Sequence, residues 1–206
     1  MKLQLIIVDY GMGNLNSVKK KLNRLNIDPK ISSNPKDILK ADKLILPGVG
    51  HFKKAMTNLV KLNLISALNE RVLVQQKPIL GICLGMQLMA NKSEEGDVKG
   101  LGWVNAEVVK FKVKDTLKYK IPHIGWNKIY KSKDSILMKG VEDLEEFYFV
   151  HSYHLKSNEK NDILNYSEYE YKFTSAIEKN NLFGVQYHPE KSHDAGEILL
   201  NYFIQL

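Results

Sequence analysis

The chain of 206 residues has a single cysteine, Cys83, only six prolines and only two tryptophans. One cysteine cannot form an intrachain disulfide, and an unpaired thiol persists best in a reducing compartment, so we expect a cytoplasmic protein. The N-terminal apolar run from Leu3 ends at Asp9, which is too short for a signal peptide or a membrane span, and no other segment comes close. A membrane protein is therefore not expected.

Internal repeats, low-complexity tracts and interdomain linkers are also missing from the sequence. Hydrophobic residues make up 44% of the chain and charged residues 26%, which is typical of a packed globular protein. The length suits one domain with a substantial core. We therefore expect residues 1–206 to form a single domain.

The formal net charge is +7, but the lysines are spread along the chain. The densest group, Lys19-Lys20-Lys21, lies on a predicted helix, where a solvated face is the simplest explanation. No recognition motif for DNA or RNA is present, so a nucleic-acid partner is not expected. A basic surface would suit phosphorylated substrates or an acidic protein partner, and charge alone does not choose between them.

Three segments of the first 90 residues repeat the order strand, glycine turn, helix. Such repeats favour a parallel sheet with helices on its faces. The strands are continuous apolar runs, as expected for strands buried on both faces. The predicted strands are Leu5 to Asp9, Lys43 to Leu46 and Ile79 to Ile82, and the helices that follow them are Leu15 to Leu25, Phe52 to Leu68 and Leu84 to Ala90.

The middle of the chain has shorter, alternating patterns that predict antiparallel strands. The fold class expected is therefore α/β, with a mostly parallel central sheet flanked by helices and additional antiparallel strands. The additional strands are predicted at Val104 to Lys112, Lys128 to Leu137, Phe147 to Tyr153 and Phe173 to Ile177, and a final amphipathic helix at Ala195 to Ile204.

Cys83 follows an apolar strand and stands between two glycines, Gly81 and Gly85. A strand that enters a helix through a very tight turn needs flanking positions nearly free of side chain, which is the pattern of a nucleophile elbow. The thiol would then lie at the carboxyl edge of a parallel sheet, where the N-terminus of the next helix favours a thiolate. The alternative is that Cys83 is simply a small buried apolar residue.

A second segment, Phe183 to Glu190, predicts a strand stopped by Pro189. Alternation along a strand places His188 and Glu190 on the same face, so Glu190 can orient the imidazole. A nucleophilic cysteine needs a base, and the base needs a third group that fixes its tautomer. Cys83, His188 and Glu190 supply these roles, although the segment alone would also fit a surface turn with an ordinary ion pair.

Acyl transfer at a thiol also needs backbone donors for the tetrahedral oxyanion. The elbow offers the N–H of Leu84, and the glycines in Gly48-Val49-Gly50 would let the Val49 peptide turn toward the oxyanion. On local sequence alone, a simple Pro-Gly turn explains this second loop equally well.

Two other site types are not supported. Gly11-Met12-Gly13 resembles the start of a dinucleotide fingerprint, but Asn16 stands in place of the third glycine, so no such cofactor is expected. Four histidines could imitate metal ligands, but they lie on different elements without cysteine partners, so no metal is expected either. They are His151, His154, His188 and His193.

These motifs resemble the three signatures of class I glutamine amidotransferase domains: Pro47-Gly48-Val49-Gly50, Gly81 to Gln87 and His188-Pro189-Glu190. Further stretches spread over nearly the whole chain resemble the family of glutaminase subunits of imidazole glycerol phosphate synthase. These stretches are Asp9 to Leu15, Ser93 to Gly96, Gly100 to Gly102, Pro122 to Asn127, His151 to Tyr153 and Glu190 to Ser192.

The resemblance implies that L-glutamine is hydrolysed through a γ-glutamyl thioester on Cys83, without a cofactor. It implies a heterodimer with a (β/α)8-barrel cyclase subunit, which would use the ammonia to make imidazole glycerol phosphate and an aminoimidazole carboxamide ribotide in histidine biosynthesis. The Val49 peptide would complete the oxyanion hole only when this partner is engaged. By the same analogy, glutamine would be held by Gln87, Glu95, His151, Ser152 and Tyr153, and Asn14, Trp126 and Lys191 would lie toward the partner and the ammonia path.

Several alternatives stay open at this stage. The same glutaminase chemistry could supply ammonia to a sugar amidotransferase in surface polysaccharide synthesis, and two departures from the commoner pattern, Tyr187 and Asn91-Lys92, bear on that choice. A non-catalytic scaffold or a cysteine peptidase of related fold would use the same architecture. Trp126 would serve equally well as ordinary packing.

Overall fold

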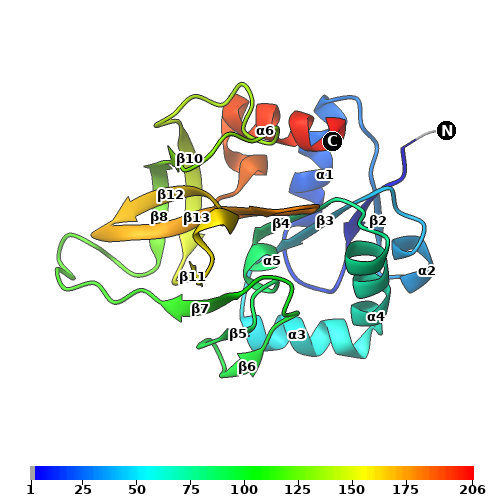
Figure 1. Cartoon of the computed structure of the whole chain (residues 1–206), viewed down its shortest axis with the longest axis horizontal. Helices are drawn as coiled ribbons and strands as arrows, with labels where there is room; N and C mark the ends of the chain where they lie inside the picture. The colour runs from blue at the N-terminus through cyan, green and yellow to red at the C-terminus, as the bar shows by residue number, and fades with distance from the viewer. Residues whose placement is uncertain (1–2) are drawn as a thin grey trace.

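The structure is a computed structural model, and it describes residues 3–206. The centre of the molecule is a large sheet. Five neighbouring strands at one side of this sheet run parallel, in the spatial order β2, β1, β3, β4 and β14 (Figure 1). β14 comes from near the end of the chain, yet it pairs with β4 from the first half. Their bounds are β1 Leu5–Val8, β2 Lys30–Ser32, β3 Lys43–Gly48, β4 Ile79–Cys83 and β14 Leu182–Val185.

Beyond β14 the sheet continues through antiparallel pairs to β13, β11 and β7, at the end of the molecule opposite the N-terminus (Figure 1). A separate antiparallel ribbon joins β8 to β10. The bounds here are β5 Lys92–Ser93, β6 Val98–Lys99, β7 Ala106–Lys110, β8 His123–Lys128, β9 Tyr130–Lys131, β10 Glu146–His151, β11 Tyr153–Ser157, β12 Ile163–Tyr169 and β13 Tyr171–Lys179. The predicted α/β class with added antiparallel strands is confirmed.

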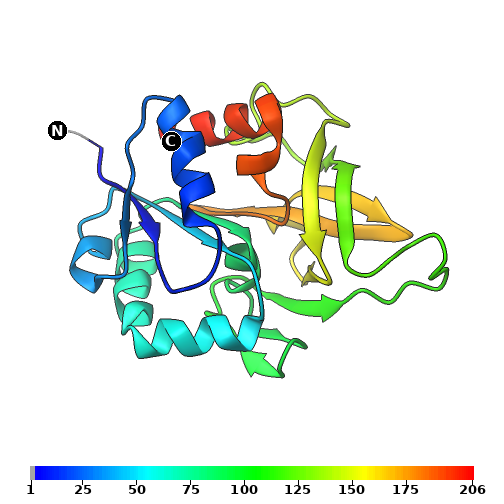
Figure 2. The ribbon, with the colours of Figure 1, turned by 180° about the vertical axis from the view of Figure 1, so that it is seen from behind.

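Helices cover both faces of the parallel strands (Figure 2). Along β1, Leu5 and Ile7 pack on the side of α1 and α6, whereas Ile6 and Val8 pack on the side of α2, α3 and α4. A strand buried on both faces needs apolar side chains at every position, which explains its continuous apolar run. The bounds are α1 Leu15–Arg24, α2 Pro35–Ile38, α3 Phe52–Lys61, α4 Leu64–Asn69, α5 Leu84–Gln87 and α6 His193–Gln205.

Four expected elements differ in the structure. The helix predicted from Phe52 to Leu68 is two helices, because Asn63 adopts a left-handed conformation with φ 55° between them. The helix expected up to Ala90 ends at Gln87, and the strand expected through Phe147 to Tyr153 is interrupted at Ser152. The segment expected to form a strand from Lys128 to Leu137 contains only the short antiparallel strand β9 and the last residue of β8, most of which precedes it.

Lys21 also departs from expectation, because it is buried rather than part of a solvated helix face. Its Nζ lies 2.8 Å from the His193 carbonyl oxygen and 2.8 Å from Glu197 Oε1, so it joins α1 to α6. A buried ammonium needs such partners to offset the loss of water.

Within residues 3–206, no helix is both long enough and apolar enough to cross a bilayer.

Candidate functional site

Cys83 is the last residue of β4 and precedes α5, in a strained conformation with φ 54° and ψ −110°. A positive φ is costly for a residue with a side chain and is tolerated where the surrounding structure enforces it. The turn is tight because α5 lies directly against β3: a Cβ on Gly85 would stand 1.6 Å from the Leu46 carbonyl oxygen. The predicted nucleophile elbow is therefore present, and Cys83 is 5% exposed.

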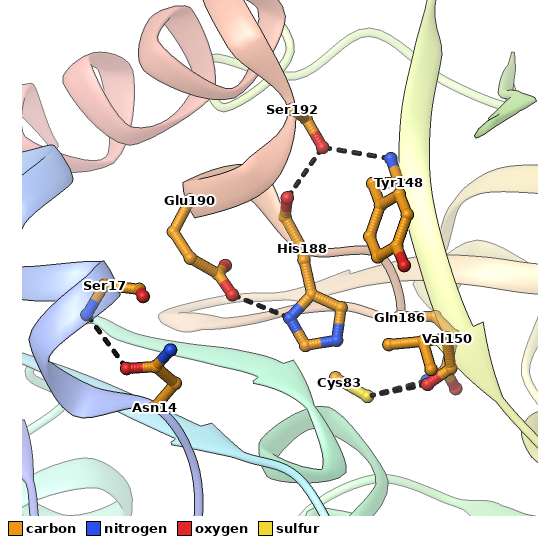
Figure 3. A network of polar contacts seen from close by, with 9 residues as sticks. All are labelled: Asn14, Ser17, Cys83, Tyr148, Val150, Gln186, His188, Glu190 and Ser192. Atoms are coloured by element: carbon orange, nitrogen blue, oxygen red, sulfur yellow. Dashed lines mark hydrogen bonds and ion pairs between the residues drawn. The ribbon is translucent and has the colours of Figure 1, made fainter. Parts of the chain in front are cut away.

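His188 and Glu190 form a buried pair beside this thiol (Figure 3). His188 Nδ1 lies 2.7 Å from Glu190 Oε1, and the two side chains are 2% and 3% exposed. The sequence predicted this contact from strand alternation, but Glu190 lies in a 3-10 turn, Pro189–Lys191, that follows β14. The turn brings the carboxylate back to the imidazole.

The main chain of His188 is anchored to β10. Its N–H donates to the Tyr148 carbonyl at 2.9 Å, and its own carbonyl accepts from the Ser192 hydroxyl at 2.6 Å. The same hydroxyl accepts from the Tyr148 N–H at 3.0 Å (Figure 3). The imidazole is therefore held by contacts on both its main chain and its side chain.

The charge state of His188 follows from its neighbours. Burial opposes protonation, but the Cys83 thiolate and the Glu190 carboxylate outweigh it and raise the pKa of His188 to about 10. Nδ1 then donates to Glu190, and Nε2 has no hydrogen-bond partner in the described part of the chain. A thiolate and imidazolium pair is the form that attacks a carbonyl carbon and then protonates the leaving amine.

Gln186 is a site residue that the sequence interpretation missed. It is fully buried, and its Nε2 lies 3.5 Å from Cys83 Sγ (Figure 3). Its Oε1 accepts from Gln87 Nε2 at 2.9 Å. The signal was available, because strand alternation places Gln186 on the same face as His188.

One backbone carbonyl sets the direction of these hydrogen bonds. The Tyr153 oxygen can only accept, so the amide group of Gln87 that lies 2.9 Å from it must be its NH₂. That NH₂ also contacts Gln186, which must therefore present its oxygen to Gln87 and its own NH₂ to the Cys83 sulfur. A donor is thus aimed at the nucleophile.

The Tyr153 carbonyl oxygen also fixes the tautomers of two histidines, His151 and His123. His151 Nδ1 must carry a proton, because it lies 2.8 Å from the Tyr153 oxygen, and His151 Nε2 then accepts from His123 Nδ1 at 3.1 Å. Burial holds the pKa of His151 well below its ordinary value and lowers that of His123 to about 4. Both rings are therefore neutral at physiological pH and act as fixed dipoles.

A cleft of about 470 Å³ opens over Cys83, and all five of the predicted substrate-binding residues line it. Its wall also supplies two residues of the predicted oxyanion segment, together with Pro122 and Val150. The residues that line it are Val49, Gly50, Cys83, Leu84, Gln87, Glu95, Pro122, Val150, His151, Ser152, Tyr153 and Lys191.

The predicted oxyanion segment lies at the carboxyl edge of the sheet, beside Cys83. Gly48 pairs with Cys83 in the β3–β4 register, so the Val49 peptide follows directly beside the thiol. Gly50 has φ +115°, and the Val49 side chain is 40% exposed. The segment leads into α3, whose Phe52 N–H donates to Glu95 Oε2 at 2.7 Å.

Of the three residues expected at a partner surface, Lys191 lines this cleft, whereas Trp126 lines a separate pocket beside His193. Trp126 is 44% exposed and stacks on His193, with ring centroids 4.8 Å apart and an angle of 4° between the planes. Lys191 is exposed, with its Nζ 5.3 Å from the centroid of the Tyr148 ring. Asn14 caps α1, where its side-chain oxygen accepts from the Ser17 N–H at 3.2 Å.

The histidines that could imitate a metal site are dispersed. His154 Nε2 lies 3.0 Å from the Tyr171 hydroxyl, His193 stacks on Trp126, and the others belong to the contacts described above. Across residues 3–206, no group of three or more His, Cys, Asp or Glu side chains could hold a metal ion.

The sequence of residues 6–206 matches the family described as Glutamine amidotransferase class-I. The chain belongs to this family. Among curated members, it is 50% identical to a Methanococcus maripaludis protein named Imidazole glycerol phosphate synthase subunit HisH 2, over 97% of this chain and 98% of the relative. It is 48% identical to the HisH 1 protein of Campylobacter jejuni strain RM1221, with coverages of 97% and 98%. The HisH 2 protein of Pseudomonas aeruginosa is 42% identical, with coverages of 98% and 99%.

Solved structures agree on the class-I amidotransferase fold. A putative GMP synthase protein from Thermoplasma acidophilum superposes with a TM-score of 0.75 at 20% identity, covering 100% of this chain and 94% of that one. The glutaminase domain of Trypanosoma brucei CTPS, solved with bound acivicin, gives a TM-score of 0.64 at 18% identity, with coverages of 98% and 94%. At these identities the likeness establishes the fold alone.

Proposed function

We propose that residues 1–206 act as one glutamine amidotransferase domain that hydrolyses L-glutamine through a thioester on Cys83. The observation that carries the proposal is the strained elbow thiol with the buried His188–Glu190 pair beside it. Family membership supports glutamine as the substrate. A catalytic thiol of this kind also favours work in a reducing compartment such as the cytoplasm.

The proposed reaction begins when the Cys83 thiolate attacks the side-chain amide carbon of glutamine. The N–H groups of Leu84 and Val49 would stabilise the tetrahedral oxyanion. The imidazolium of His188 would pass its Nε2 proton to the leaving nitrogen, so that the C–N bond breaks and ammonia departs. A water molecule would then attack the thioester with His188 as base, releasing glutamate and restoring the thiolate.

The cleft supports recognition of an amino acid. Glu95, one of the lining residues, is a carboxylate suited to an α-ammonium group, although one of its oxygens already accepts from Phe52. The amide hydrogens of Gln87 are both directed into the protein, toward Tyr153 and Gln186, which leaves its side-chain oxygen for a ligand. We propose that His151, Ser152 and Tyr153 complete the glutamine site.

We further propose that the ammonia passes to a (β/α)8-barrel cyclase subunit in a heterodimer that serves histidine biosynthesis. Curated relatives named as subunits of imidazole glycerol phosphate synthase support this acceptor. The exposed face of the β8–β10 ribbon supports a partner surface beside the cleft, because Ile124 is 58% exposed and Trp126 is 44% exposed. Asn14 and Lys191 would extend that surface.

A second acceptor is favoured by one observation. The same Methanococcus strain has two relatives, HisH 1 and HisH 2, which are 43% and 50% identical to this chain. Two such subunits in one organism leave room for different acceptors. The second candidate is therefore the same glutaminase supplying ammonia to a sugar amidotransferase in surface polysaccharide synthesis.

The test is glutamine turnover by the purified chain, alone and with a cognate cyclase subunit that carries its nucleotide ligand. We expect strong stimulation by the loaded cyclase, and Cys83→Ala should abolish ammonia release while the fold is retained. Near wild-type turnover in Cys83→Ala would remove the thiol from the mechanism. A chain that forms a thioester with glutamine but gains nothing from the cyclase would point to the sugar amidotransferase.

A further inference from the structure

Tyr10 follows β1 at the carboxyl edge of the sheet and is fully buried, yet its hydroxyl has no hydrogen-bond partner within residues 3–206. Its main chain is fixed to α3, since its carbonyl accepts from Asn58 Nδ2 at 2.9 Å. A buried hydroxyl without an acceptor destabilises a protein, and such a group in a native structure calls for a reason. The proposed reaction makes no use of this residue.

The position of the hydroxyl gives the reason. A Cβ built on Gly48 would lie 2.0 Å from the Tyr10 oxygen and 3.1 Å from the Leu84 Cβ. The hydroxyl therefore lies against Gly48. This glycine precedes Val49 and lies beside Leu84, the two proposed oxyanion donors. Burial, and then the nearby Cys83 thiolate, raise the pKa of Tyr10, so the hydroxyl keeps its proton and remains a donor.

The peptide between Gly48 and Val49 is planar, so its N–H and its C=O point in opposite directions. If the Val49 N–H turns toward an oxyanion over Cys83, the Gly48 carbonyl must turn the other way. Two features permit this rotation: glycine on both sides of Val49, with Gly50 already at φ +115°, and a Val49 side chain that is 40% exposed.

We propose that the Tyr10 hydroxyl is the donor that receives the Gly48 carbonyl when the Val49 N–H turns toward the oxyanion. Tyr10 is thus a positioning residue for the active conformation of the segment. In the resting conformation the unsatisfied hydroxyl destabilises the protein. A hydrogen bond to the reoriented Gly48 carbonyl would remove this penalty. The inference rests on the proposed glutaminase function and adds to it the residue that holds the oxyanion donor in place.

The variant that isolates the hydroxyl is Tyr10→Phe, studied in the complex with the loaded partner subunit. We expect stimulated glutamine turnover to fall about tenfold, which is the effect of one net hydrogen bond. The thermal midpoint of unfolding should stay constant or rise, because the substitution removes an unsatisfied buried group. Alkylation of Cys83 by iodoacetamide should keep its rate, since the thiol is untouched.

Tyr187→Phe is the matched control. Tyr187 is the other fully buried tyrosine with a raised pKa, but its hydroxyl is satisfied, lying 3.1 Å from Asn165 Nδ2. Removing this hydroxyl leaves the Asn165 amide with only the weak Met138 sulfur, 3.8 Å away, as acceptor, so the thermal midpoint should fall while stimulated turnover is retained. The two variants therefore separate a hydroxyl that stabilises the resting fold from one that serves turnover.

Two results would overturn the inference: stimulated turnover in Tyr10→Phe equal to that of the wild type, or a loss of turnover that accompanies a lowered thermal midpoint, which marks a purely structural role. A wild-type chain that neither hydrolyses glutamine nor forms a thioester at Cys83 would refute the glutaminase function, and the role of Tyr10 would fall with it. The wild-type assay thus tells the two failures apart.

Discussion

Replacing Gln186 with methionine should make the Cys83 thiol markedly less reactive. Gln186 Nε2 donates toward Sγ over 3.5 Å, and methionine has nearly the same length but no donor. A hydrogen bond to a charged group contributes about 1.5 to 3 kcal/mol of stabilisation. Because the sulfur is a diffuse acceptor and lies 3.5 Å from the Gln186 nitrogen, we take the lower figure of about 1.5 kcal/mol for this bond. That loss corresponds to about a tenfold change in the equilibrium between thiolate and thiol, in favour of the thiol.

The assay is the rate of Cys83 alkylation by iodoacetamide at pH 7, because the thiolate is the reacting form. Gln186→Met should react more slowly than the wild type, by up to about tenfold. Gln186→Glu should be slower still, since the Gln87 amide holds one carboxylate oxygen and the other then faces the thiolate. The lone cysteine makes the readout unambiguous.

Asn181→Leu is the control for the loss of a partly buried, hydrogen-bonded amide. Asn181 precedes β14 at the end of that strand away from the cleft, and its Nδ2 donates to the carbonyls of Val72 and Lys77. This variant should lose stability and keep the alkylation rate. Wild-type alkylation in Gln186→Met would refute the reasoning, because it would mean that the Gln186 amide does not stabilise the thiolate.

Three further predictions concern charge and packing. Cys83→Ala should lower the pKa of His188 from about 10, since it removes the thiolate that favours the imidazolium; a histidine NMR titration with an unchanged midpoint would contradict this. His123 has a folded pKa of about 4, below its unfolded value near 6.5, so its stabilisation is present above pH 6.5 and lost as pH falls through 4. His123→Gln should therefore abolish about 3 kcal/mol of the loss in unfolding free energy between pH 7 and pH 4, measured by denaturant titration, and equal losses in both proteins would disprove it. Gly85→Ala should prevent correct folding, because its Cβ would stand 1.6 Å from the Leu46 oxygen, and a variant with wild-type circular dichroism and thermal midpoint would show that β3 and α5 can separate.

The features that the sequence predicted well are those with local causes. The elbow needs only a strand, a nucleophile and two glycines within five residues, and the structure has it at Gly81 to Gly85. The pairing of His188 with Glu190 also follows from their spacing, although a turn rather than a strand produces it. Continuous apolar runs such as β1 were recognisable because both faces of the parallel sheet are covered.

The features that were missed depend on neighbours distant in the sequence. Lys21 was assigned to a solvated face because its burial depends on His193 and Glu197 of α6. The hydroxyl of Tyr10 has no local sign of being unsatisfied, since only the approach of Gly48 from β3 places it there. The shift of a predicted strand to β8 reflects its pairing with β10 across a long connection.

The pairing of β14 with β4 has a consequence while the chain is being synthesised on the ribosome. Gln186 and Cys83 are in contact but stand 103 residues apart, and His188 arrives on the same late strand. A nascent chain that has completed only β4 therefore carries the thiol without the histidine proposed as its base and without its amide donor. Closing the long loop between such distant segments carries an entropic cost that local contacts do not. In the proposed mechanism, glutamine cleavage requires β14 to be in place, so a chain that has not completed β14 would hydrolyse no glutamine and release no ammonia.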